Sequence, residues 1–245
     1  AGELVRARRE HTAITVAATK SSPTDVVTAS DRDSEQLIRT RLLVARPADG
    51  FLGEEGAGVE GSSGVRWVVD PIDGTVNYLY DIPAYAVSIA AVVADESVAG
   101  VVHVPATGET WTATRGGGAF HNGRAIEVST CARLDRALIG TGFGYDSERR
   151  AAQAQVVARL LPRVRDIRRF GAASIDLCQV AMGRLDGYYE QGLAAWDRAA
   201  GTLVAAEAGA LVGGLGEEPA SERLTVTAGP ALYPLLQQLL AELGA

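Results

Sequence analysis

Two aspartates stand three positions apart directly after an apolar, β-branched stretch of the sequence. Trp67-Val68-Val69 is typical of a buried strand, and the run 70–75 that follows it reads Asp-Pro-Ile-Asp-Gly-Thr. Carboxylate oxygens are the ligands that Mg²⁺ prefers, and N–H groups exposed in a glycine turn can bind an oxyanion such as phosphate. The run therefore indicates metal-dependent phosphate chemistry, and a plain Pro-x-Asp-Gly turn is the alternative interpretation.

A second pair of acids lies a short distance earlier in the chain. Glu54 and Glu55 follow a brief apolar strand at 51–52 and are flanked by glycines. Adjacent acids on a loop are usually only solvated. Here a short glycine-rich loop at 61–64 separates them from the strand that ends at Asp70, so we expect the two strand ends to lie side by side.

Two more aspartates fall in the first turns of predicted helices. Asp197 follows Trp196 at the start of a small-residue helix, and Asp31 follows Ser30, which can cap a helix over 30–45. Each aspartate could simply cap its helix or complement the helix dipole. The bulky Trp196 favours a buried position for Asp197, and a buried carboxylate needs a partner such as a cation.

The elements that must position these acids fall into two halves. A β-meander is predicted from Tyr85 to Val128, and helices alternate with strands from about Leu134 onward. The expected strands cover 86–93, 98–104, 110–114, 119–121, 125–128, 137–141, 166–170, 185–190 and 224–227. The expected helices cover 2–10, 30–45, 148–161, 172–183, 195–207 and 231–243, and a turn is expected at 21–25. We therefore divide the chain into an α+β half, residues 1–133, and an α/β half, residues 134–245.

Composition excludes several classes of protein. The chain has 245 residues, of which 47% are hydrophobic and 22% charged, as in ordinary globular proteins, and its net charge of −7 argues against binding to nucleic acid. No apolar run is long enough for a membrane span and no signal peptide is visible. Two cysteines without metal-ligand spacing, Cys131 and Cys178, favour a reducing cytoplasm. The sequence begins inside a predicted helix, which suggests trimming at the N-terminus.

Taken together, the acidic motifs resemble the inositol monophosphatase family, in particular its bacterial, actinobacterial branch. The motifs that carry the resemblance are Gly53-Glu54-Glu55, Asp70-Pro71-Ile72-Asp73-Gly74-Thr75, Trp196-Asp197-Arg198-Ala199-Ala200, the run from Lys20 to Thr28, and the segment from Asp176 to Glu190. They occur in the family's order and span nearly the whole chain. The family has helices ahead of Ala1 that pack around the Lys20 loop, and their absence from this sequence puts the stability of that loop in question.

The resemblance implies a layered αβαβα sandwich, a homodimer and inhibition by Li⁺. Two to three Mg²⁺ ions are expected in each site. Glu54, Asp70 and the carbonyl of Ile72 would hold the first ion, and Asp70, Asp73 and Asp197 the second, while a weaker third ion would share Glu54.

The resemblance also implies roles for the residues around the metals. Asp31 and Thr75 would form a hydrogen-bonded pair that orients the attacking water together with Glu54. The N–H groups of Gly74 and Thr75 would bind phosphate. The alcohol part of the substrate, a polyol, would lie against Ala173, Asp73 and Glu190.

The expected reaction is hydrolysis of a small-molecule phosphate monoester, myo-inositol monophosphate, to inositol and phosphate. Metal-activated water can serve as nucleophile, so neither cysteine nor histidine is required. Two alternatives stay open: a histidinol-phosphate or bisphosphate-nucleotide phosphatase of the same superfamily, or a regulatory protein-binding role.

Overall fold

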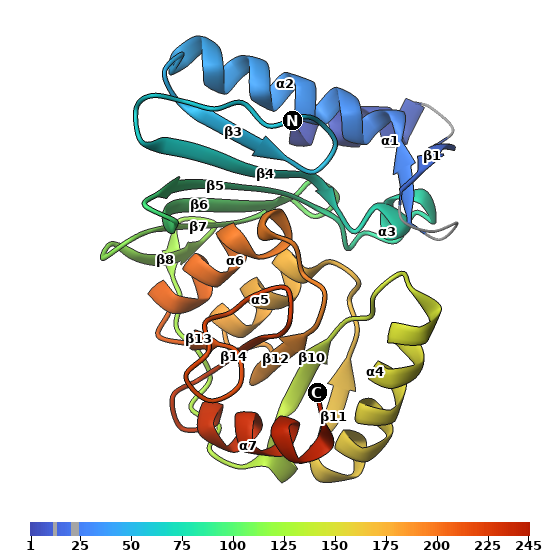
Figure 1. Cartoon of the computed structure of the whole chain (residues 1–245), viewed down its shortest axis with the longest axis vertical. Helices are drawn as coiled ribbons and strands as arrows, with labels where there is room; N and C mark the ends of the chain where they lie inside the picture. The colour runs from blue at the N-terminus through green and yellow to red at the C-terminus, as the bar shows by residue number, and fades with distance from the viewer. Residues whose placement is uncertain (12–13, 21–24) are drawn as a thin grey trace.

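The computed structural model describes residues 1–11, 14–20 and 25–245. They form five layers, in the order helices, sheet, helices, sheet, helices (Figure 1). The helices are α1 (Gly2–His11), α2 (Ala29–Ala45), α3 (Thr75–Leu79), α4 (Ser147–Leu160), α5 (Ala173–Ala181), α6 (Ala195–Glu207) and α7 (Tyr233–Leu243), with 3₁₀ turns η1 (Leu134–Arg136) and η2 (Leu161–Arg163). The predicted αβαβα fold is confirmed. The boundary at residue 133 stays a prediction.

The first sheet has seven strands in the order β3-β4-β5-β6-β7-β8-β9. Its strands are β3 (Gly50–Gly53), β4 (Val65–Asp73), β5 (Ala86–Val93), β6 (Glu96–Val104), β7 (Glu109–Thr114), β8 (Gly118–His121) and β9 (Arg124–Ala125). Strands β3 and β4 are parallel and the others are antiparallel. Because β3 and β4 are parallel, their C-terminal ends lie side by side at the same end of the sheet, as expected from the short loop at 61–64.

The second sheet has five strands in the order β11-β10-β12-β14-β13. They are β10 (Leu138–Thr141), β11 (Asp166–Arg168), β12 (Gly187–Glu190), β13 (Leu211–Gly213) and β14 (Thr225–Ala228), and a separate hairpin joins β1 (Val16–Thr19) to β2 (Val26–Thr28). Strand β10 is parallel to both of its neighbours, and β14 is antiparallel to both of its own. Helices α4 and α7 cover the outer face (Figure 1).

Helices α5 and α6 form the layer between the two sheets, and small side chains let them pack closely. Ala200, Val204 and Ala205 of α6 join a core cluster with Val102 and Trp111 of the seven-stranded sheet. A Cβ atom at Gly201 would lie 2.9 Å from the Cβ of Leu177 on α5, so glycine permits this close approach. This middle layer brings the start of α6, and therefore Asp197, to the first sheet.

Two expectations about secondary structure were wrong, and two elements were missed. The strand expected over 125–128 ends at Ala125, because the chain then leaves the sheet and the Val128 N–H donates to Ala208 of the other half. Strand β13 and helix α3 were not expected. Helix α2 is capped by Thr28 rather than Ser30.

Other expectations were confirmed or lie outside the described residues. The expected turn at 21–25 falls mostly outside them. Both cysteines are free thiols, with Cys178 buried and Cys131 partly buried. Within the described ranges, none of the helices has the length and apolarity needed to cross a bilayer.

Candidate active site

A bulge in β4 places Asp70 and Asp73 on the same face of the sheet. Residues three apart in a regular strand point to opposite faces. Here Asp70 pairs with Ser88 and Asp73 pairs with Ala86, so three steps along β4 match two along β5. The extra residue in the bulge turns both carboxylates toward the second half of the molecule. Both aspartates are buried.

The chain leaves β4 through a left-handed glycine. Gly74 has a φ of 89°, and a Cβ there would lie 2.9 Å from the carbonyl oxygen of Ala84 and 3.1 Å from the Cβ of Ala172. A larger residue would therefore both strain the backbone and separate the two halves. Helix α3 begins at the next residue, Thr75.

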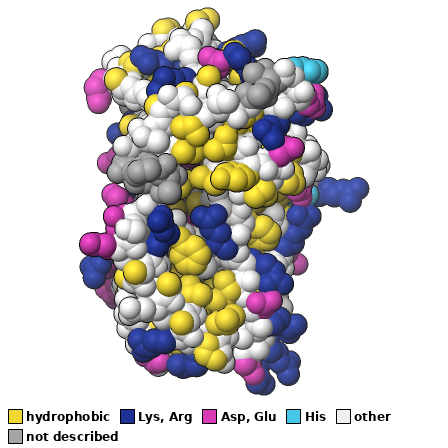
Figure 2. Space-filling view, turned by 90° about the vertical axis from the view of Figure 1, so that its right-hand side faces the viewer, with side chains coloured by type: hydrophobic (Ala, Val, Ile, Leu, Met, Phe, Trp, Pro, Cys, Tyr) yellow, Lys and Arg dark blue, Asp and Glu magenta, His cyan; other side chains and the backbone are white. Residues whose placement is uncertain are grey.

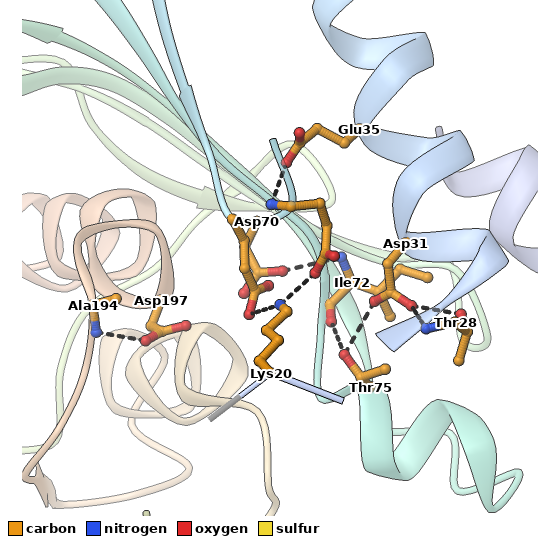
Figure 3. A network of polar contacts seen from close by, with 11 residues as sticks. Lys20, Thr28, Asp31, Glu35, Asp70, Ile72, Thr75, Ala194 and Asp197 are labelled. Carbon is orange, nitrogen blue, oxygen red and sulfur yellow. Dashed lines mark hydrogen bonds and ion pairs between the residues drawn. The ribbon is translucent and has the colours of Figure 1, made fainter. Parts of the chain in front are cut away.

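Thr75 contacts Asp31, which the sequence places 44 residues earlier. Its hydroxyl lies 3.1 Å from a carboxylate oxygen of Asp31 and 3.1 Å from the carbonyl oxygen of Ile72 (Figure 3). The other carboxylate oxygen of Asp31 accepts the N–H of Thr28 at 2.8 Å, so Asp31 also caps α2. Burial raises the pKa of Asp31 to about 6, although hydrogen bonds from Thr28 oppose the shift.

Glu54 follows β3 and faces a lysine from the β1–β2 hairpin. The ammonium of Lys20 lies 2.8 Å from a carboxylate oxygen of Glu54 and also pairs with Glu55. Burial lowers the pKa of Lys20, but the attraction of Glu54 and Glu55 outweighs burial and raises it overall. The Glu55 N–H donates to Glu35 at 2.8 Å, which fixes the loop to α2.

Asp73 and Asp197 are held by N–H groups at the starts of two helices in the middle layer. Asp73 accepts the Ser174 N–H at 2.7 Å and the Ser174 hydroxyl at 2.5 Å, and Asp197 accepts the Ala194 N–H at 2.6 Å. Asp197 thus caps α6 and also faces the other acids. Trp196, whose bulk favoured a buried position for Asp197, is itself partly buried: it packs against the core cluster between the two sheets and lines the cavity.

Glu190, the acid expected to contact the polyol, ends β12 and lines the cavity with a partly buried side chain. It accepts the hydroxyl of Tyr188 and packs against Gly142, where any Cβ would collide with it. Burial raises the pKa of Glu190 to about 7, and the Tyr188 hydrogen bond opposes the shift.

One cavity of about 520 Å³ unites these side chains. This volume lies within the range of small-molecule sites. The predicted site residues that line the cavity are Glu54, Asp70, Ile72, Asp73, Gly74, Thr75, Ala173, Glu190 and Asp197. Asp31 lies behind Thr75. Sequence reasoning missed Arg149 and Arg169, which also line the cavity, because neither the Arg149-Arg150 pair nor the Arg168-Arg169 pair belongs to a recognisable motif.

The electrostatics of this cluster favour a cation. Burial and then the charges of Glu54 and Asp73 raise the pKa of Asp70 well above its ordinary value, and burial and then Asp73 raise that of Asp197. A divalent cation relieves such repulsion between buried carboxylates. A set of carboxylates with one backbone carbonyl fits the donor chemistry of Mg²⁺.

The described side chains are not already arranged as a metal cage. Across residues 1–11, 14–20 and 25–245, no three His, Cys, Asp or Glu side chains are placed to hold one ion together. The physical reason is that other groups hold the carboxylates: Lys20 contacts Glu54, and N–H groups contact Asp73 and Asp197. Ligation by this set therefore requires side-chain rotation.

Comparison with known proteins places the chain in a family. The model of the inositol monophosphatase family matches residues 1–244. The inositol-1-monophosphatases of Mycobacterium bovis and Mycobacterium leprae are each 52% identical over 202 residues, which cover 79% of this chain and 70% and 69% of theirs. The Nus factor SuhB of Xylella fastidiosa is 43% identical over 194 residues, covering 79% of this chain and 70% of its own.

Solved structures agree with the sequence relatives. The extragenic suppressor protein suhB from Bartonella henselae has a TM-score of 0.91 at 36% identity, covering 98% of this chain and 93% of its own. Mycobacterium tuberculosis SuhB has a TM-score of 0.83 at 43% identity, covering 99% and 91%. The resemblance drawn from the acidic motifs is thereby confirmed. The chain belongs to the inositol monophosphatase family and is a phosphoric monoester hydrolase.

Proposed function

We propose that this protein hydrolyses myo-inositol monophosphate to inositol and phosphate in a Mg²⁺-dependent reaction. The observation that carries the proposal is the Thr75–Asp31 hydrogen bond beside Asp70 and Asp73, on the wall of one cavity. Such a pair can position a water next to a phosphate held by carboxylate-bound cations. The mycobacterial relatives named inositol-1-monophosphatase support the choice of substrate.

The carboxylates would supply the ligands for two to three Mg²⁺ ions. Glu54, Asp70 and the Ile72 carbonyl would hold one ion, Asp70, Asp73 and Asp197 would hold a second, and a third would share Glu54. Bound Mg²⁺ lowers the pKa of its water, neutralises phosphoryl oxygens and stabilises the leaving alkoxide.

The chain's own residues bind the ester and orient the water. At about pH 7 Asp31 is mostly ionised, because its pKa is raised only to about 6. Its carboxylate therefore accepts a hydrogen bond that the Thr75 hydroxyl donates. This fixes the direction in which the Thr75 oxygen can accept a hydrogen bond from water. The N–H groups of Gly74 and Thr75 bind phosphate oxygens. Glu190, Asp73 and Ala173 contact the polyol.

Phosphate release from a panel of esters tests the proposal. Inositol 1-phosphate, histidinol phosphate and adenosine bisphosphate are compared with Mg²⁺ and with EDTA. We expect hydrolysis to need Mg²⁺, to be inhibited by Li⁺ and to have its highest kcat/KM on inositol 1-phosphate. Full activity after exhaustive chelation contradicts the metal assignment, and a higher kcat/KM on another ester contradicts the substrate.

A regulatory protein-binding role is the second candidate. It is supported by two relatives named Nus factor SuhB, the Xylella fastidiosa protein and one from Pseudomonas aeruginosa that is 40% identical over 218 residues. No hydrolysis of any panel ester at saturating Mg²⁺ would favour this role. The family resemblance also supports a cytoplasmic homodimer, and light scattering tests whether the chain is a dimer.

A further inference from the structure

Two pairs of adjacent arginines lie near the cavity, and in each pair only one guanidinium is bonded to residues that the structure describes. Arg150 donates to the carbonyl oxygens of Gly144 at 3.3 Å and Tyr145 at 2.8 Å. Arg168 pairs with Asp166 at 2.6 Å. Their neighbours Arg149 and Arg169 both line the cavity, and neither guanidinium has a hydrogen-bond or ion-pair partner in the part of the chain that the structure describes.

Each untied guanidinium rests on a left-handed glycine. Arg149 lies over Gly192, where φ is 93°, and Arg169 lies over Gly171, where φ is 87°; a Cβ at either glycine would collide with the arginine's Nη1. Gly192 leads to the Asp197 motif, and Gly171 leads to the start of α5. The two cationic groups therefore belong to the cavity wall on the side of the second sheet.

Helix α4, whose first turn carries Arg149, is fixed to two segments that line the cavity. Gln153 is only 6% exposed; its side-chain oxygen accepts the Gly144 N–H at 3.0 Å and its nitrogen donates to the Gln191 carbonyl at 3.4 Å. Asp146 caps the helix by accepting the Arg149 N–H at 2.8 Å. These contacts fix the position from which the Arg149 side chain reaches over Gly192.

The simplest alternative role of these arginines is to neutralise the negative charge of the carboxylates in the cavity. Arg169 does lower the pKa of Asp73 and of Glu190 through its charge, although burial dominates both shifts. However, Glu54 already pairs with Lys20, and Glu190 accepts a hydrogen bond from Tyr188. A guanidinium has five N–H donors in a planar fork that suits phosphate and carboxylate. The donors of Arg149 and Arg169 face the cavity unused by the described residues.

The face that carries α3 and α4 shows basic side chains at the middle of the molecule, among hydrophobic ones (Figure 2). We propose that Arg149 and Arg169 form a second anion subsite in the active-site cavity. A phosphate ester whose alcohol part carries another phosphate or a carboxylate would place that group against these guanidiniums. The inference rests on the proposed function, because the ester phosphate must occupy the carboxylate-lined end of the same cavity.

Matched substrate pairs test the subsite. Inositol 1,4-bisphosphate is compared with inositol 1-phosphate, and 3-phosphoglycerate with glycerol 3-phosphate, so the two pairs separate a second phosphate from a carboxylate. We expect Arg149→Gln and Arg169→Gln each to lower kcat/KM for the doubly anionic member about tenfold, since a charge-assisted hydrogen bond is lost. The singly anionic member should change less than about twofold. Arg168→Gln, which removes an arginine tied to Asp166, is the matched control and should change neither.

A binding measurement separates failure of the subsite from failure of the proposed function. Calorimetry on a Thr75→Ala background, in which turnover is slow, compares both inositol phosphates with and without Arg149→Gln. Tighter binding of the bisphosphate that is lost with Arg149→Gln and weakened by salt supports the subsite even if inositol 1-phosphate proves a poor substrate. Equal losses on both members of each pair, or none, would overturn it.

Discussion

The Lys20 ammonium and a metal ion compete for the same carboxylate, so removing the lysine should strengthen metal binding. Lys20 is the only lysine in the sequence. Its ammonium lies 2.8 Å from Glu54 and also contacts Glu55. A cation bound by Glu54 must displace this ion pair. We therefore predict that Lys20→Gln lowers the dissociation constant for Mg²⁺.

The size of the effect follows from how exposed the pair is. The side chains of Lys20 and Glu54 are 29% and 20% exposed, so the contact is neither fully solvated nor fully buried. Exposed ion pairs contribute roughly 0.2–1 kcal/mol and charge-assisted hydrogen bonds about 1.5–3 kcal/mol. We take about 1 kcal/mol as the free energy of the Lys20–Glu54 ion pair. Mg²⁺ does not have to break this pair in Lys20→Gln, so its dissociation constant should be about fivefold lower there.

Calorimetric titration with Mg²⁺ measures this change directly. Lys20→Arg keeps the charge and is the matched control, so its dissociation constant should stay near that of the parent protein. Because there is one lysine, reductive methylation with carbon-13 also gives a single lysine side-chain NMR signal beside that of the α-amino group. That signal should shift along the same Mg²⁺ titration. An unchanged dissociation constant in Lys20→Gln, with a lysine signal insensitive to Mg²⁺, would refute the competition.

Four further outcomes are expected from the site. Asp197→Asn should raise the Mg²⁺ requirement and abolish most turnover, whereas the loss of a mere helix cap would cost only about 1 kcal/mol of stability; normal turnover with a lower Tm would favour the cap. Thr75→Ala should lower kcat about a hundredfold, the scale of one positioned acid–base contact, with Mg²⁺ affinity retained in calorimetry. The pKa of Asp31 is raised from 3.8 to about 6 in the folded state, so the folded state binds the proton more tightly and Tm measured in EDTA should fall as pH rises between these two values, while activity with Mg²⁺ rises. Asp31→Asn should make this fall in Tm shallower, and the other buried acids should account for what remains. Glu190→Gln should raise KM for inositol 1-phosphate more than for a simple phosphate ester without ring hydroxyls, and an equal effect on the two would mean that Glu190 does not contact the polyol.

The sequence was sufficient to predict the layered fold but not the geometry within β4. Alternation and turn signals identified the meander and the α/β half because they are local patterns. The bulge that brings Asp70 and Asp73 onto one face depends on pairing with β5, which no local pattern encodes. The error at 125–128 has a similar origin. That stretch favours a strand by composition, yet Val128 bonds to Ala208 in the other half of the molecule.

The alternatives set for Asp31 and Asp197, helix cap or site residue, turn out not to exclude one another. A carboxylate has two oxygens, and in Asp31 one accepts the Thr28 N–H while the other lies next to the Thr75 hydroxyl. Asp197 similarly accepts the Ala194 N–H with one carboxylate oxygen, which leaves its second oxygen for another group. A cap fixes the side chain to a rigid helix end, and a rigid end is what a site residue needs for its position. A capping signal in the sequence is therefore compatible with a chemical role, and the group opposite the second oxygen shows whether the aspartate has such a role as well.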